Sequence, residues 1–171
     1  MATPPTSSVT SSKNNKKITR ILIVDDEYDV AISLKVLLED EGYDDEKEKE
    51  TRQEEEQQDN NTTSTSNRAK EFEVDVFNDP EVVLSNFKAG QYDLLLLGIV
   101  MPKMYGFKLY EKMKNIDDNV KVCFITVYMV NYDAVRNMFP STTQIDCFLR
   151  KPIQQKELKN RVREELRRRS L

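Results

Sequence analysis

The chain has 171 residues, of which 33% are charged and 38% are hydrophobic, and its formal net charge is −4 at pH 7. It contains no histidine and only four glycines, which excludes imidazole chemistry and leaves little from which to build a glycine-rich nucleotide loop. No stretch approaches the roughly 18 consecutive apolar residues of a membrane span, so we expect a cytoplasmic protein without membrane contact.

Two polar blocks hold too few apolar residues to contribute to a core. Residues 1–17 are mostly Ser, Thr, Pro, Asn and Lys, and residues 44–70 are rich in Glu, Asp and Lys, with Ala69 as their only apolar residue. Burial cannot offset the entropy of ordering such segments. We therefore expect a disordered arm over 1–17 and a disordered acidic insertion over 44–70, within a single domain that spans residues 18–171.

The rest of the chain alternates between short apolar runs and segments with helical spacing. The expected strands are residues 18–24, 72–77, 94–97, 120–126 and 145–149, and the expected helices are residues 29–42, 78–90, 103–115, 131–139 and 153–169. Residues 72–77 have one polar face, typical of a sheet edge, whereas the four leucines of 94–97 indicate a central strand. This alternation predicts an α/β fold with a parallel sheet covered on both faces.

Polar residues follow several of the expected strands, at the edge where such sheets hold their functional groups. Asp25 and Asp26 follow the first strand, Thr126 closes the fourth, and Lys151 follows the fifth. Each has an ordinary explanation alone, as a helix cap, a strand-end threonine or a surface lysine. Together, the carboxylates suit Mg²⁺, and the hydroxyl and ammonium suit phosphoryl oxygens. The set predicts a site for a divalent cation and an anionic group.

Four separated motifs resemble the receiver domain of two-component response regulators. They are VDDE (Val24–Glu27), LLLLGIVMPKMYG (Leu94–Gly106), FITVY (Phe124–Tyr128) and FLRKP (Phe148–Pro152). The resemblance implies a flavodoxin-like, doubly wound sheet of five parallel strands in the order 2-1-3-4-5. It also implies a phosphorelay partner, either a histidine kinase or a phosphotransfer protein, together with a downstream signalling protein. The chain itself is then expected to be a signalling module and not an enzyme.

The resemblance also implies roles for six positions. They are the Mg²⁺ ligands Asp25, Asp26 and the backbone carbonyl of Val100, the phosphoryl contacts Thr126 and Lys151, and the aromatic switch residue Phe148.

Gly98 stands where this family places its phosphoacceptor aspartate. Glycine has no carboxylate to form an acyl phosphate. Mg²⁺ should also be held weakly, because two acids and Lys151 give a formal charge of only −1. We interpret the chain as a stand-alone receiver-like module, a pseudo-receiver that works by contact. Two alternatives stay open: an ordinary phosphorylatable receiver in which Gly98 is a recent change or a reading error, or phosphorylation of another acid such as Asp25 or Asp26.

The sequence disfavours two further functions. The basic C-terminal segment, residues 150–171, could serve a nucleic-acid-associated protein, but it has no helix-turn-helix and no interleaved aromatic residues. We therefore expect no nucleic-acid partner. A flavin carrier is disfavoured, because the acids after the first strand would repel a phosphate.

The two cysteines, Cys123 and Cys147, lie inside apolar runs. We expect them on neighbouring strands, where buried cysteine behaves as a small hydrophobic side chain, and we do not expect a disulfide between them.

Overall fold

A five-stranded parallel sheet forms the centre of the molecule. The computed structural model describes residues 18–40, 70–128, 131–140 and 145–168, so the expected disordered arm and nearly all of the acidic insertion lie outside the described residues. The strands are β1 (Thr19–Val24), β2 (Phe72–Phe77), β3 (Leu94–Gly98), β4 (Lys121–Thr126) and β5 (Phe148–Arg150). Their order is β2-β1-β3-β4-β5, and every neighbouring pair is parallel. The predicted fold and strand order are confirmed.

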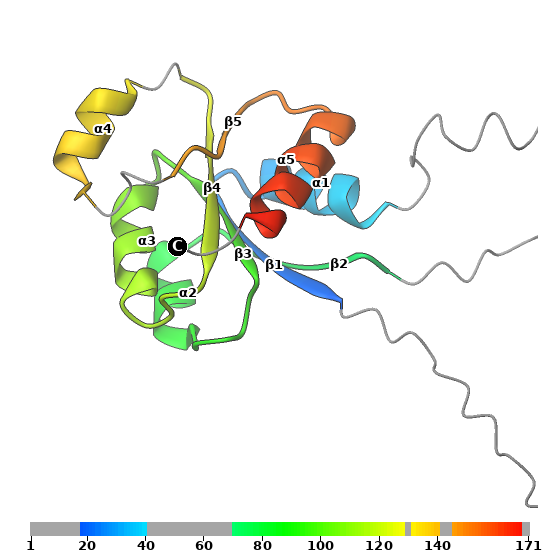
Figure 1. Cartoon of the computed structure of the whole chain (residues 1–171), viewed down its shortest axis with the longest axis horizontal. Coiled ribbons are helices and arrows are strands. Elements are labelled where there is room, and N and C mark those ends of the chain that lie inside the picture. Colours follow the sequence, from blue (N-terminus) through cyan, green and yellow to red (C-terminus); the bar gives the residue numbers. More distant parts are fainter. Residues whose placement is uncertain (1–17, 41–69, 129–130, 141–144, 169–171) are drawn as a thin grey trace, which may run out of the picture.

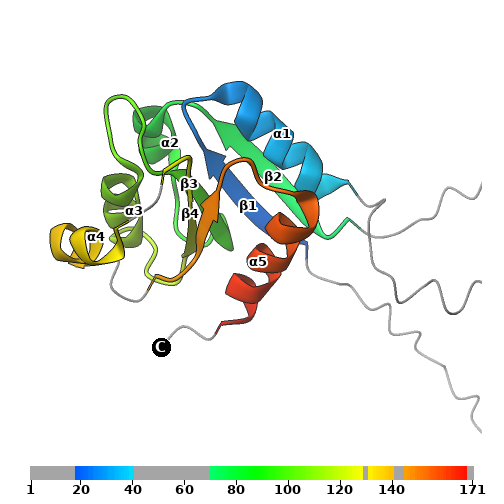
Figure 2. The same cartoon turned by 90° about the horizontal axis from the view of Figure 1, so that it is seen from above.

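Helices cover both faces of this sheet. They are α1 (Tyr28–Glu39), α2 (Pro80–Asn86), α3 (Gly106–Lys114), α4 (Tyr132–Met138) and α5 (Gln155–Arg167). Figures 1 and 2 show α1 and α5 on one face, and α2 and α3 on the other, with α4 on the same side as α3. None of the described helices is long and apolar enough to cross a membrane.

The four leucines of β3 supply both hydrophobic cores. Successive side chains of a strand point to opposite faces, so Leu94 and Leu96 pack in the core beneath α1 and α5, whereas Leu95 and Leu97 pack in the core beneath α2 and α3. All four are fully buried. The prediction of a central strand, buried on both faces, is confirmed.

Several element boundaries differ from those expected. The third helix begins at Gly106 and not at residue 103, because Lys103 has a φ of 69°, a left-handed conformation that cannot lie in a right-handed helix. A Cβ on Gly106 would lie less than 3.0 Å from the carbonyl oxygen of Gly98, so the loop can return to the end of β3 only through a glycine. The fifth strand is also shorter than expected and begins at Phe148.

Cys123 and Cys147 are joined by a disulfide, and the expectation of two separate buried thiols is wrong. Cys123 belongs to β4 as expected, but Cys147 lies directly before β5 and not within it. The pairing could not be read from the sequence, since it depends on the register between these two strands.

Candidate functional site

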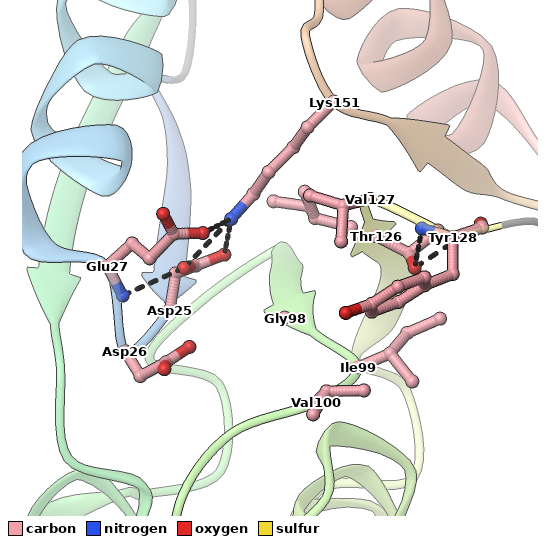
Figure 3. A pocket seen from close by; sticks show the side chains of 11 residues that line it. Asp25, Asp26, Glu27, Gly98, Ile99, Val100, Thr126, Val127, Tyr128 and Lys151 are labelled. Carbon is pink, nitrogen blue, oxygen red and sulfur yellow. Dashed lines mark hydrogen bonds and ion pairs between the residues drawn. The ribbon is translucent and has the colours of Figure 1, made fainter.

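The polar residues predicted at the strand ends converge on one small cavity. Asp25 follows β1, Thr126 ends β4 and Lys151 follows β5. The cavity holds about 40 Å³ and lies at the end of β3, where Gly98 lines it. Figure 3 shows Asp25 and Thr126 on opposite sides of Gly98. Its lining residues are Asp25, Asp26, Glu27, Gly98, Ile99, Val100, Ile125, Thr126, Val127, Tyr128 and Lys151.

Lys151 is held by two carboxylates. Its Nζ lies 2.8 Å from Oδ2 of Asp25 and 3.0 Å from Oε1 of Glu27. The lysine side chain is 13% exposed and that of Asp25 only 2%. Partial burial by itself lowers the pKa of Lys151, but the hydrogen bonds and charges of Asp25 and Glu27 outweigh it and raise the pKa above its ordinary value. Lys151 is therefore charged at neutral pH.

Asp25 and Asp26 differ in what they offer to a ligand. Asp25 is buried, binds Lys151, and accepts a further hydrogen bond from the backbone N–H of Glu27 at 3.1 Å. Asp26 is exposed, and Figure 3 shows its carboxylate on the side of the cavity that Val100 lines. Carboxylate and carbonyl oxygens are the donors that Mg²⁺ takes in proteins.

The Thr126 hydroxyl is hydrogen-bonded within its own loop. Its Oγ1 accepts a hydrogen bond from the backbone N–H of Tyr128 at 3.0 Å. The backbones of the two residues are nevertheless joined, because the N–H of Lys151 donates to the carbonyl oxygen of Thr126 at 2.8 Å. The two strand ends are thus held in a fixed relation.

Gly98 leaves room that Asp25 partly occupies. A Cβ built on Gly98 would lie 3.0 Å from Oδ2 of Asp25 and 3.4 Å from Cγ of Met101. The first distance is tighter than an ordinary van der Waals contact, so a side chain at position 98 requires the Asp25 carboxylate to move slightly. Asp25 is the acidic side chain that faces the empty position.

Two lining residues with polar side chains, Glu27 and Tyr128, were not predicted from the sequence. Glu27 was quoted in a motif but given no role, although it binds Lys151. With Glu27 the formal charge of the cavity is −2 and not the expected −1. A third acid in a row after a strand was the available signal for Glu27; no comparable signal marked Tyr128.

Phe148 lies outside the lining of this cavity. Its ring is half-buried and packs on Phe124, with 5.7 Å between ring centroids. This contact places Phe148 at the border of the core beneath α2 and α3.

Cations of the basic C-terminal segment bind the domain itself. Arg163 forms a two-pronged ion pair with Glu71, with nitrogen–oxygen distances of 2.7 and 3.0 Å. Lys159 is buried and donates to the backbone carbonyl of Asp40. These basic residues of α5 therefore stabilise the fold through contacts within the domain.

Comparison with known proteins identifies the family. The model of the response regulator receiver domain matches residues 53–163. The transcriptional regulatory protein DltR of Streptococcus agalactiae is 26% identical over 152 residues, which cover 89% of this chain and 54% of DltR. Sporulation initiation phosphotransferase F of Bacillus subtilis is 27% identical over 109 residues, or 64% of each chain. The chain thus spans about half the length of the DltR relatives it matches.

Solved structures agree on the fold. The CheY-like receiver domain protein from Methanospirillum hungatei superposes with a TM-score of 0.59 at 24% identity, covering 88% of this chain and 94% of that one. The response regulator TrrA from Thermotoga maritima, solved in complex with Mg²⁺ and BeF, gives a TM-score of 0.52 at 23% identity, covering 86% and 98%. With the family model matching well over half of the sequence, this chain belongs to the response regulator receiver domain family of two-component signalling.

Proposed function

We propose that this receiver works by protein contact and does not form the usual aspartyl phosphate. The observation that carries the proposal is the end of β3, where Gly98 offers no side chain and the carboxylate of Asp25 faces the empty position. An acyl phosphate needs a carboxylate oxygen as nucleophile. Asp25 is a poor substitute, since both of its oxygens bind Lys151 and one also accepts the N–H of Glu27.

The ion pairs of Lys151 support the same proposal. A lysine in this position suits a phosphoryl oxygen, but here Asp25 and Glu27 already neutralise it within the folded chain. The positive charge therefore needs no added phosphoryl group to be satisfied. We infer that the rim rests in one arrangement and presents it to its partners, which by the chemistry of the family are a histidine kinase or a phosphotransfer protein and a downstream signalling protein.

Mg²⁺ would be held at this rim by Asp25, Asp26 and the backbone carbonyl of Val100. These oxygens fit the ion in kind, and the exposed Asp26 is the acid with most freedom to bind it. Binding should be weak, because Asp25 must share its oxygens with Lys151. The ion would supply charge compensation for an incoming anion.

We also propose that the domain begins at residue 18, well before the start of the family match at residue 53. β1 pairs with both β2 and β3, and its last four residues are fully buried. A sheet without this strand would lose its continuity between β2 and β3. Residues 18–40 are therefore part of the folding unit.

Phosphodonor labelling tests the proposal. The full chain, Gly98→Asp and Gly98→Asn are each incubated with acetyl phosphate and Mg²⁺, and intact mass is measured before and after hydroxylamine. We expect no phosphoryl group on the wild type or on Gly98→Asn, and one hydroxylamine-labile group on Gly98→Asp. A hydroxylamine-labile adduct on the wild type would overturn the proposal.

The same variants address whether an ordinary receiver lost its acceptor recently. In that case Gly98→Asp should label readily and unfold at nearly the same denaturant concentration as the wild type. If the surrounding residues have adapted to glycine, Gly98→Asp should instead lower the stability of the fold, since the new Cβ would lie too close to the Asp25 carboxylate. The unfolding midpoints of Gly98→Asp and Gly98→Asn, each set against the wild type, separate the two cases, because both variants carry the added Cβ.

A further inference from the structure

The disulfide between Cys123 and Cys147 joins two strands that both end at the candidate site. Thr126 comes three residues after Cys123, and Lys151 comes four residues after Cys147. The crosslink lies one position before the first paired residues of β4 and β5, Phe124 and Phe148. There the N–H of Phe124 also donates to the carbonyl oxygen of Cys147 at 2.9 Å.

The crosslink closes a loop of the chain that contains α4. The two cysteines are 24 residues apart in sequence, and α4 lies between them. β5, on the far side of this loop, has only three paired residues and forms the edge of the sheet. Few ladder hydrogen bonds hold β5 in the sheet. We therefore expect its position to depend strongly on the disulfide.

The sulfur atoms are buried beside the end of α5. Both cysteines are buried, at 0% and 3% exposure. A carboxylate oxygen of Glu165 lies within 4.8 Å of both sulfurs, and α5 ends two residues later at Arg167. Helix ends fray more readily than helix centres, so opening the last turn of α5 would expose the sulfurs to a small molecule.

We propose that Cys123 and Cys147 form a reversible redox site that exchanges with small disulfides of the glutathione class. In the oxidising direction a Cys thiolate attacks one sulfur of oxidised glutathione and releases one glutathione thiolate. The second Cys thiolate then attacks the mixed disulfide and releases the other. Two electrons pass from the protein thiols to glutathione, and each released thiolate takes up a proton that a Cys thiol has lost.

This site gives the domain an input that needs no phosphoacceptor. In a reducing compartment, protein disulfides are mostly transient and used for catalysis or sensing. Reduction would remove the covalent restraint on β5, and with it part of the restraint on Lys151, which directly follows β5. The inference does not depend on the chemistry at Gly98, and it would hold even if the wild type were phosphorylated.

The full chain tests it in glutathione buffers of graded ratio. After equilibration, free thiols are trapped with N-ethylmaleimide and counted by intact mass; only this pair can react, because the sequence has two cysteines. We expect one two-electron transition, with no alkylated thiols at the oxidising end and two at the reducing end. Alkylation of both thiols in every buffer, or of neither in any buffer, would overturn the proposal.

Hydrogen exchange measures the structural consequence. Oxidised and reduced wild type are compared, so no variant needs to fold, and Cys147→Ser serves as a permanently open control. We expect faster deuterium uptake in α4 and β5 of the reduced chain and of Cys147→Ser, with β1 and β3 unchanged. Equal uptake in α4 and β5 of the two redox forms would reject the link between the crosslink and these elements.

Discussion

Lys151 is the cation on which the buried carboxylate of Asp25 depends. Replacing it by methionine nearly keeps the length of the side chain and removes the charge, which leaves the Asp25 carboxylate with the backbone N–H of Glu27 as hydrogen-bond donor. Breaking a buried pair from one side leaves an uncompensated charge. We expect Lys151→Met to lower the free energy of unfolding by about 2 kcal/mol, since Lys151 keeps some contact with water.

Urea unfolding at pH 7 measures this loss. The matched control is Asp25→Asn combined with Lys151→Met, which removes the orphaned charge and should recover part of the stability. If Lys151→Met unfolds at the wild-type midpoint, the pair contributes nothing to the fold.

The same pair sets a pH dependence. The folded pKa of Lys151 is raised above its ordinary value of 10.5, so its stabilising contribution is complete below pH 10.5 and is lost as the pH rises through the folded pKa. We expect wild type and Lys151→Met to differ by a constant free energy from pH 7 to pH 10 and to converge above that range. Unfolding series at both ends of the range, compared between the two proteins, check this. A difference that grew with rising pH would have the wrong sign.

Gly106 is required by close approach and Gly90 by backbone conformation. A Cβ on Gly106 would overlap the carbonyl of Gly98, which is backbone and cannot rotate away. Gly106→Ala should therefore cost about 3 kcal/mol, at the upper end of overpacking effects. Gly90 has open space around it and a φ of +71°, so Gly90→Ala should cost only about 1 kcal/mol. Denaturant midpoints of the two variants give the comparison; equal costs would rule out the overlap.

Among the elements, α4 depends on its N-terminal cap. The side chain of Asn131 accepts a hydrogen bond from the N–H of Ala134 at 3.0 Å. Asn131→Ala should cost about 1 kcal/mol, the usual value of such a cap. Because α4 has only seven residues, we expect the loss to appear as local fraying. Hydrogen exchange of α4 amides measures it, with the exposed Asn137→Ala as control; equal protection in both variants would show that the cap is unimportant.

Strands were predictable where burial alone defines them. The apolar run of β1 and the leucines of β3 can fit only a sheet buried on both faces, and both strands lie there. Element boundaries were predicted wrongly where long-range geometry determines them. Helix α3 begins only at Gly106, because the preceding loop must first pass close to the end of β3. Residues 145–147 were expected in the fifth strand but lie before the short β5 ladder. Local periodicity carries no information on such contacts.

The site was predictable in position and less so in its pairing. Strand ends in a parallel sheet meet at one edge, which was enough to bring Asp25, Thr126 and Lys151 together. The choice of Asp25 and Glu27 as partners of Lys151 depends on side-chain directions after β1. Local sequence patterns do not reveal these directions, because they depend on contacts between residues far apart in the chain. The disulfide was not predicted for the same reason, because the pairing of the two cysteines depends on the register of β4 and β5.

For the whole molecule, the crosslink should stabilise the fold chiefly by restricting the unfolded chain. Closing a loop between residues 24 apart removes conformational entropy worth about 3 kcal/mol in the chain-entropy treatment. We therefore expect reduction to lower the unfolding free energy by about this amount, and to raise the m-value because the unfolded chain becomes more extended. Guanidinium unfolding with and without a non-thiol reductant measures both quantities, with Cys147→Ser as a variant indifferent to the reductant. The ladders that join β1, β3 and β4 do not include the crosslink, so the reduced chain should still unfold in one transition. Identical midpoints in the two redox forms would mean that the crosslink does not restrain the unfolded state.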